Sequence, residues 1–147
     1  MVNVIIIHGS YGSPDENWLP WLKAELEKDG HDVYVPKFPT PGGQSLENWL
    51  KVFEKYERFL NEDAVLIGHS IGPGFILNVL ENLEHPVRAC FFVAGFLGRL
   101  DNPDFDGINT EVIRFLAHHP EYLNELNWRR FEELLTELFG DMGYEPY

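Results

Sequence analysis

The sequence predicts an α/β fold in which a parallel sheet of about four strands is covered by helices on both faces. Short runs of β-branched residues alternate with longer segments that have helical periodicity, and the order reads β-α-β-α-β-α-β. Such an order predicts parallel strands joined by right-handed crossovers. The first and third runs also end in glycine-containing turns, which is typical of strands whose carboxyl ends form a site.

The first three elements follow from local pattern. Residues 2–8, VNVIIIH, form an apolar β-branched run and predict a buried strand. Residues 16–30 have apolar side chains at helical spacing and stop at Gly30, which predicts a helix. Residues 31–36, HDVYVP, predict a second strand.

The next four elements continue the alternation. A helix is expected over 45–60, with Ser45 as its N-cap and apolar side chains on one face. The third strand is AVLIG at 64–68, and the third helix follows over 71–83. The fourth strand is RACFFVAGF at 88–96.

After residue 100 the pattern changes. An acidic loop containing proline and glycine, LDNPDFDGIN, is followed by segments with helical spacing. We therefore expect a helical C-terminal tail over 110–147 and no further strand. No repeat or linker-like tract interrupts residues 1–147, so a single domain is predicted.

Composition narrows the class of protein. The chain has 147 residues with 24 acidic and 11 basic side chains, a net charge of −13, which disfavours binding to nucleic acid or to an anionic membrane. The single cysteine, Cys90, lies in an apolar run and predicts a buried side chain rather than a disulfide. Neither a signal peptide nor a transmembrane run is recognisable, so a cytoplasmic protein is expected.

The stretch AVLIGHSIGPGF at 64–75 carries the main chemical signal. It places Ser70 at the apex of a G-x-S-x-G motif between a strand and a helix. This is the context of a serine nucleophile held on a sharp turn, where residues two before and two after the serine must be small. Gly68 and Gly72 stand at those positions. The alternative is a glycine-rich turn in which the serine only caps the helix.

A nucleophilic serine in acyl transfer needs backbone N–H groups directed at the developing oxyanion. One is expected from Ile71, which follows the serine. The other is expected from the loop after the first strand, from Ser10 or Tyr11. The alternative for that loop is a glycine turn without function.

Other chemistries lack their motifs. The sequence contains no phosphate-binding loop of the G-x-x-x-x-G-K-[ST] type and no G-x-G-x-x-G after the first strand. It also lacks H-E-x-x-H and any cluster of cysteine and histidine ligands, and His118 and His119 project in different directions from a helix. No cofactor and no metal site are predicted.

Several spaced motifs resemble the small serine hydrolases related to retinoblastoma-binding protein nine. They are the opening VIIIHGSYGSPDENWLPWLKAELEKDGHDVYVPKFPTP with its NWLPWL run, then LENW, LIGHSIG and FFVAGFLGRLDNPDFDGIN. The resemblance covers residues 2–109. It implies a compact α/β-hydrolase-like fold with little or no lid, a Ser-Asp-His triad with Ser70 as nucleophile, and hydrolysis of small carboxylic esters or amides.

The family's acid and base follow two further strands, in loops resembling D-x-x-V-P and G-G-H, and the tail matches neither. One interpretation is a rebuilt triad, with Asp101 as the acid and His118 or His119 as the base. A second is a degenerate hydrolase that acts as a non-catalytic binding module. A third is a half-enzyme completed by another chain, with homo-oligomers formed through the edge strand 88–96 or the C-terminal helix.

Overall fold

The computed structural model of the chain describes residues 1–95 and residue 108. The chain divides into two compact units, Met1–Phe115 and Leu116–Tyr147, and every described residue lies in the first. The elements follow the expected order, and the strands and helices are β1 Asn3–Ile7, α1 Leu19–Lys28, β2 Asp32–Tyr34, α2 Leu46–Glu57, β3 Val65–His69, α3 Gly72–Glu81 and β4 Ala89–Val93.

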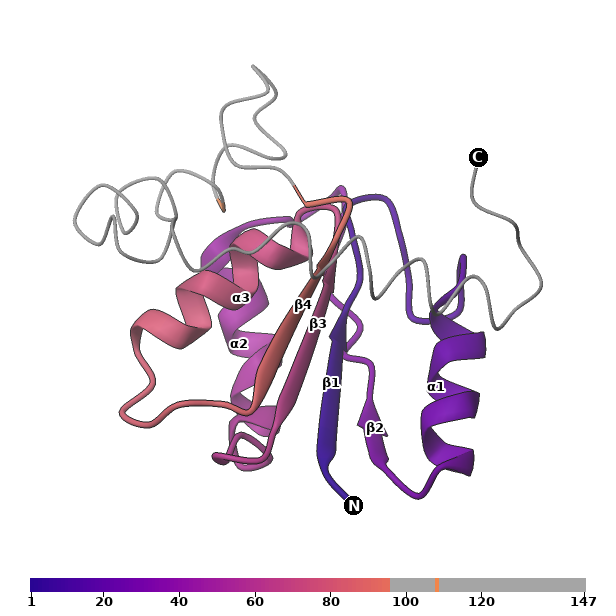
Figure 1. Cartoon of the computed structure of the whole chain (residues 1–147). Helices are drawn as coiled ribbons and strands as arrows, with labels where there is room; N and C mark the ends of the chain where they lie inside the picture. The colour runs from indigo at the N-terminus through magenta and orange to yellow at the C-terminus, as the bar shows by residue number, and fades with distance from the viewer. Residues whose placement is uncertain (96–107, 109–147) are drawn as a thin grey trace. The chain divides into compact units, whose positions relative to one another are not determined.

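The four strands form one parallel sheet in the order β2-β1-β3-β4. Leu66 of β3 pairs with Ile5 of β1 on one side and with Cys90 of β4 on the other. All four arrows therefore point the same way (Figure 1). The carboxyl ends of β1 and β3, the central strands, lie side by side, which confirms the predicted α/β fold and brings the two glycine turns to one edge.

The helices α2 and α3 cover one face of the sheet (Figure 1). Trp49 and Phe53 of α2 and Phe75 of α3 are almost fully buried there, against Ile5 and Ile7 of β1. Burial of each large apolar side chain contributes roughly 1.5–3 kcal/mol relative to leaving it in water. This aromatic layer fixes the position of α3 and hence of the turn that precedes it.

The helix α1 covers the opposite face (Figure 1). Its buried Leu19 and the partly buried Leu22 and Leu26 pack against Val4 and Ile6 of β1. Because successive strand residues point to opposite faces, β1 supplies both cores from a single β-branched run. The strand is thereby buried on both sides, as the sequence predicts.

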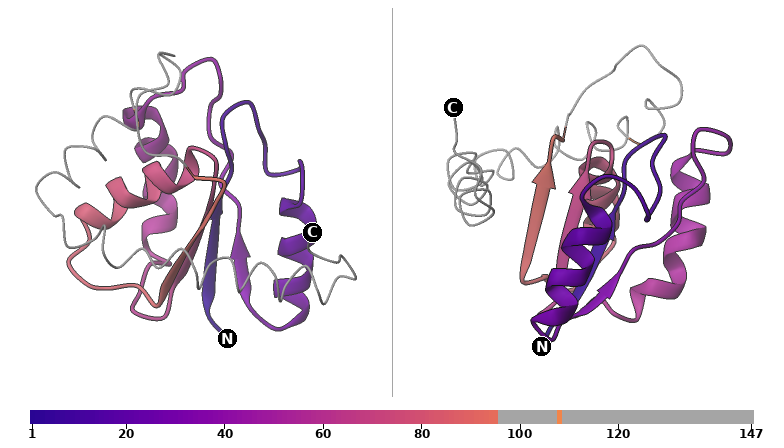
Figure 2. Two further views of the ribbon diagram at one scale, coloured as in Figure 1. Left: turned by 45° about the horizontal axis from the view of Figure 1, so that its top comes forward. Right: turned by 90° about the vertical axis from the view of Figure 1, so that its right-hand side faces the viewer.

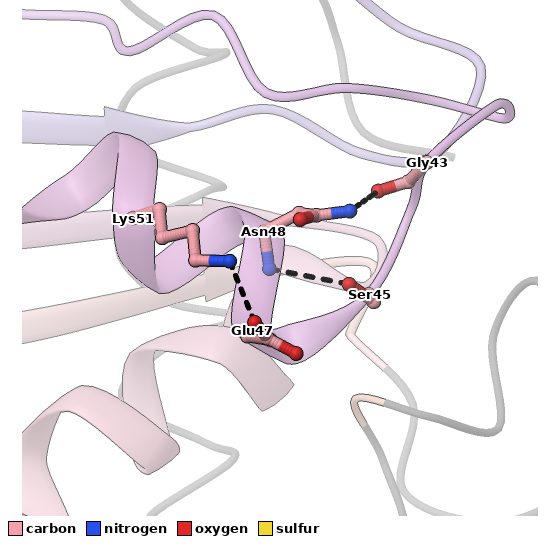
Figure 3. Close-up of polar contacts among 5 residues, drawn as sticks. All are labelled: Gly43, Ser45, Glu47, Asn48 and Lys51. Carbon is pink, nitrogen blue, oxygen red and sulfur yellow. Dashed lines mark hydrogen bonds and ion pairs between the residues drawn. The ribbon is translucent and has the colours of Figure 1, made fainter.

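The start of α2 is capped as expected. The Oγ atom of Ser45 accepts a hydrogen bond from the backbone N–H of Asn48 at 3.2 Å (Figure 3). The helix ends at Glu57, before the predicted end at Leu60. The reason is a tighter last turn, in which the N–H groups of Phe59 and Leu60 donate to carbonyls three residues back.

The predicted helical tail over 110–147 and the acidic loop before it lie outside the described residues, apart from Ile108. In the part of the chain that is described, β4 forms one edge of the sheet. Self-association through 88–96 and a single domain over 1–147 stay predictions. Among the helices of residues 1–95, none is long and apolar enough to cross a membrane.

Candidate active site

Ser70 occupies the turn between β3 and α3 in the left-handed backbone region, with a φ of 58°. A residue with a Cβ atom adopts this region at a cost of order 1–3 kcal/mol unless surrounding contacts hold it there. One such contact is the N–H of Ser70, which donates to the carbonyl of Val93 at the end of β4, at 3.0 Å. The sequence prediction of a strained serine at the carboxyl edge of the sheet is confirmed.

The flanking glycines permit this turn. A Cβ atom on Gly68 would lie 2.6 Å from the backbone nitrogen of Pro73, and one on Gly72 would lie 2.8 Å from the carbonyl oxygen of Ile7. Both partners are backbone atoms that cannot rotate away. The turn therefore requires glycine at both positions, as the motif predicts.

The loop after β1 packs directly against the serine. A Cβ atom on Gly9 would lie 2.9 Å from the Cβ of Ser70, so the loop and the turn are in contact. The loop closes on itself through a hydrogen bond from the N–H of Gly12 to the carbonyl of Gly9 at 3.3 Å. Any shift of this loop therefore changes the surroundings of the Ser70 side chain.

Two of the three candidate oxyanion donors carry backbone N–H groups that have no acceptor in the described part of the chain. Among residues 1–95 and 108, no acceptor takes a hydrogen bond from the N–H of Ser10 or of Ile71. The N–H of Tyr11 differs, because it donates to the Oγ1 of Thr40 at 2.8 Å. Ile71 also immediately precedes the first residue of α3, where the positive end of a helix dipole favours negative charge.

His8 serves the fold rather than acting as a base. Its ring is 1% exposed, and its Nε2 accepts a hydrogen bond from the N–H of Phe38 at 3.0 Å. The proton is therefore on Nδ1, which donates to the carbonyl of Gly9 at 2.8 Å. Burial lowers the pKa of His8, so the neutral ring is favoured. Both ring nitrogens are thus engaged, and the bond to Nε2 joins the end of β1 to the segment that follows β2.

His69 precedes the serine and packs edge-on against Trp18, with ring centroids 5.6 Å apart. Burial lowers the pKa of His69 as well. Neither His8 nor His69 hydrogen bonds to the Oγ of Ser70, and no other side chain among residues 1–95 and 108 does so. The candidate acid and base, Asp101, His118 and His119, lie outside the described residues.

Two polar residues in the segment after β2 join the site without having been singled out from the sequence. The hydroxyls of Ser10 and Thr40 both donate to the Oε1 of Gln44, at 2.7 and 2.6 Å. The only sequence signal is their place among prolines and glycines after the second strand. Figure 2 shows the loops after β1 and β2 rising beyond the same edge of the sheet. In this described portion, no cluster of His, Cys, Asp or Glu side chains is arranged to hold a metal ion.

The family model for serine hydrolases matches residues 4–114, three-quarters of the chain. The chain belongs to the serine hydrolase family. The chain is similar to the putative hydrolase YdeN of Bacillus subtilis (strain 168), to which it is 40% identical over 95 residues. That alignment covers 63% of this chain and 50% of YdeN, so the chain spans about half the length of the curated relative that it matches.

Solved structures agree with the family's fold. The crystal structure of the ydeN gene product from B. subtilis superimposes with a TM-score of 0.68 at 33% identity, over 74% of this chain and 60% of that one. An extracellular α/β-hydrolase from a Paenibacillus species gives a TM-score of 0.55 at 24% identity, over 67% of this chain and 43% of that one. A pyrethroid hydrolase from Sphingobium faniae JZ-2 gives 0.55 at 20% identity, over 65% and 40%. The last two likenesses show the α/β-hydrolase fold alone.

Proposed function

We propose that this serine hydrolase family member hydrolyses small carboxylic esters or amides, with Ser70 as the nucleophile. The observation that carries the proposal is the left-handed backbone conformation of Ser70 between β3 and α3. Such a strained conformation persists only where the surrounding structure holds it. The acidic chain, with a net charge of −13, and its single cysteine suit a small-molecule hydrolase of the cytoplasm.

The proposed chemistry proceeds in two steps. The Oγ of Ser70 attacks the substrate carbonyl carbon while a base takes the hydroxyl proton, and the carbonyl oxygen becomes an oxyanion. The N–H groups of Ile71 and Ser10 would stabilise that charge, because neither has an acceptor among the described residues. The alcohol or amine leaves with the proton from the base. Water then attacks the acyl-enzyme through the same base, which releases the acid and restores the serine.

The choice of Ser10 over Tyr11 as the second donor follows from the geometry of the loop. The N–H of Tyr11 is already used by the hydroxyl of Thr40 at 2.8 Å. The hydroxyl proton of Ser10 points to Gln44, which leaves the backbone N–H of Ser10 as its donor to an oxyanion.

The base and acid are proposed from the order of residues along the chain. His118 or His119 would take the proton from Ser70, and Asp101 would orient the histidine, which retains the order Ser, Asp, His. Of the histidines in residues 1–95, the two at the carboxyl ends of β1 and β3, His8 and His69, are held by packing contacts. A base from a later segment is therefore needed.

Steady-state hydrolysis of p-nitrophenyl acetate and butyrate tests the proposal. We expect turnover by the full chain, a loss of about 10³-fold or more in kcat in Ser70→Ala, and unchanged kcat in the control Ser45→Ala, which alters only the cap of α2. Loss of turnover in His118→Ala or His119→Ala would identify the base. Full activity in Ser70→Ala, or in both histidine variants, would contradict the respective assignment.

A second candidate function rests on the contacts of Ser70, whose Oγ has no hydrogen-bonded base among residues 1–95 and 108. A hydrolase fold that lacks an acid and base would bind a small carbonyl compound without turnover, or would be completed by another chain. Absence of turnover together with binding of an ester analogue would favour the binding module. Activity that rises more steeply than in proportion to protein concentration would favour completion by a second copy.

A further inference from the structure

The segment after β2 is joined to the loop after β1 by a continuous set of hydrogen bonds. The N–H of Tyr11 donates to the Oγ1 of Thr40 at 2.8 Å, and that hydroxyl donates to the Oε1 of Gln44 at 2.6 Å. The same oxygen accepts from the Oγ of Ser10 at 2.7 Å. We call this set of four residues the Thr40–Gln44 relay.

The direction of each bond in the relay is fixed by chemistry. The Oε1 of Gln44 carries no proton, so the hydroxyls of Thr40 and Ser10 must both donate to it, while the Oγ1 of Thr40 accepts from the N–H of Tyr11. The amide oxygen of Gln44 has two lone pairs, and the two hydroxyls occupy both. Each member of the relay thus constrains the next.

The relay is itself anchored to the core. The N–H of Phe38 donates to His8, and the indole Nε1 of the buried Trp49 donates to the carbonyl of Pro39 at 2.9 Å. The side chain of Asn48 donates to the carbonyl of Gly43 at 2.8 Å (Figure 3). His8, directly after β1, and two residues of α2 therefore hold the segment 38–44 at both ends.

We propose that Thr40 and Gln44 are positioning residues for the oxyanion loop. Thr40 withdraws the N–H of Tyr11 from the reaction, and Gln44 holds Ser10 so that its backbone N–H serves as the donor. The loop touches the nucleophile, since a Cβ on Gly9 would lie 2.9 Å from the Cβ of Ser70. A loosened relay therefore misplaces the donor relative to the serine. The inference rests on the proposed hydrolase function.

The test compares Thr40→Val, which keeps the shape and removes the hydroxyl, with Thr40→Ser, which keeps the hydroxyl. In the full chain, we expect Thr40→Val to lower kcat for p-nitrophenyl acetate by about tenfold to a hundredfold with little change in KM, because misplacement by about 1 Å can have that effect. Thr40→Ser should recover most of the rate. Gln44→Met provides a second variant that removes the acceptor, with the same expected loss.

A control in the same neighbourhood separates positioning from stability. Ser45→Ala removes the cap of α2, next to Gln44 in the sequence, without touching the relay. It should lower the melting temperature by about 2–4 °C and leave kcat unchanged. Equal kcat in Thr40→Val and Thr40→Ser, or an equal loss of kcat in Ser45→Ala, would overturn the positioning role.

Amide hydrogen exchange at Tyr11 gives a readout that does not depend on turnover. The exchange should accelerate at least about tenfold in Thr40→Val but not in Ser45→Ala, because only the first removes the acceptor. Unchanged exchange in Thr40→Val would refute the relay itself. If exchange is faster in Thr40→Val but the wild-type protein neither hydrolyses esters nor reacts at Ser70, the relay exists and the proposed function is refuted. The positioning role is then refuted with it.

Discussion

Replacement of Gly68 by alanine probes the requirement for a small residue two positions before Ser70. The new Cβ would lie 2.6 Å from the backbone nitrogen of Pro73, 0.8 Å short of the 3.4 Å at which ordinary contact begins. It would also lie 2.8 Å from the carbonyl carbon of Gly72 and 2.9 Å from the Cδ1 of Ile76. Only the last of these can give way by rotation, so the turn or α3 must shift.

Overpacking of this kind costs about 1–3 kcal/mol, and two backbone clashes place Gly68→Ala at the upper end. At about 2–4 °C per kcal/mol, the melting temperature should fall by about 6–12 °C. Gly42→Ala is the matched control, because a Cβ there meets no atom of residues 1–95 and 108 within 4 Å. That variant should be neutral or more stable by up to about 1 kcal/mol. Thermal melts followed by circular dichroism would decide, and equal melting of Gly68→Ala and wild type would refute the reasoning.

Three further outcomes are expected. Burial holds the pKa of His8 below its ordinary 6.5. The contribution of the neutral His8 ring to stability is therefore complete above pH 6.5 and is lost as the pH falls through the lower pKa of the folded state. When the pH is lowered from 7.5 to 5, the urea midpoint of unfolding should decrease less in His8→Gln than in wild type. Burial raises the pKa of Cys90 to about 12, so a disulfide reagent at pH 8 should modify it at least about a hundredfold more slowly than in the urea-unfolded chain. Light scattering over a wide concentration range should show self-association through 88–96 or the tail, and a monomer throughout would contradict that expectation.

The helices and strands and the turn at Ser70 could be predicted because their signals are local. The β-branched run of β1 and the periodicity of α2 depend on residues a few positions apart. The glycines around Ser70 are likewise required by backbone contacts within one short turn, apart from the approach of Gly72 to Ile7. Local rules therefore placed Ser70 correctly on a strained turn between a strand and a helix.

The surroundings of Ser70 could not be predicted in the same way. The Thr40–Gln44 relay and the bond from Phe38 to His8 join residues about 30 positions apart, and no spacing rule indicates which hydroxyl meets which amide. The helix α2 ended early because of a tightened last turn, which depends on competing hydrogen bonds rather than on apolar spacing. Long-range polar contacts of this kind need the fold before they can be assigned.

Covalent labelling by a fluorophosphonate, read by intact mass and peptide mapping, tests the central claim that Ser70 is an activated nucleophile. We expect one adduct on the native chain, located at Ser70, absent in Ser70→Ala and absent after unfolding in urea. A native chain that gains no adduct, or an adduct that persists in Ser70→Ala, would contradict it.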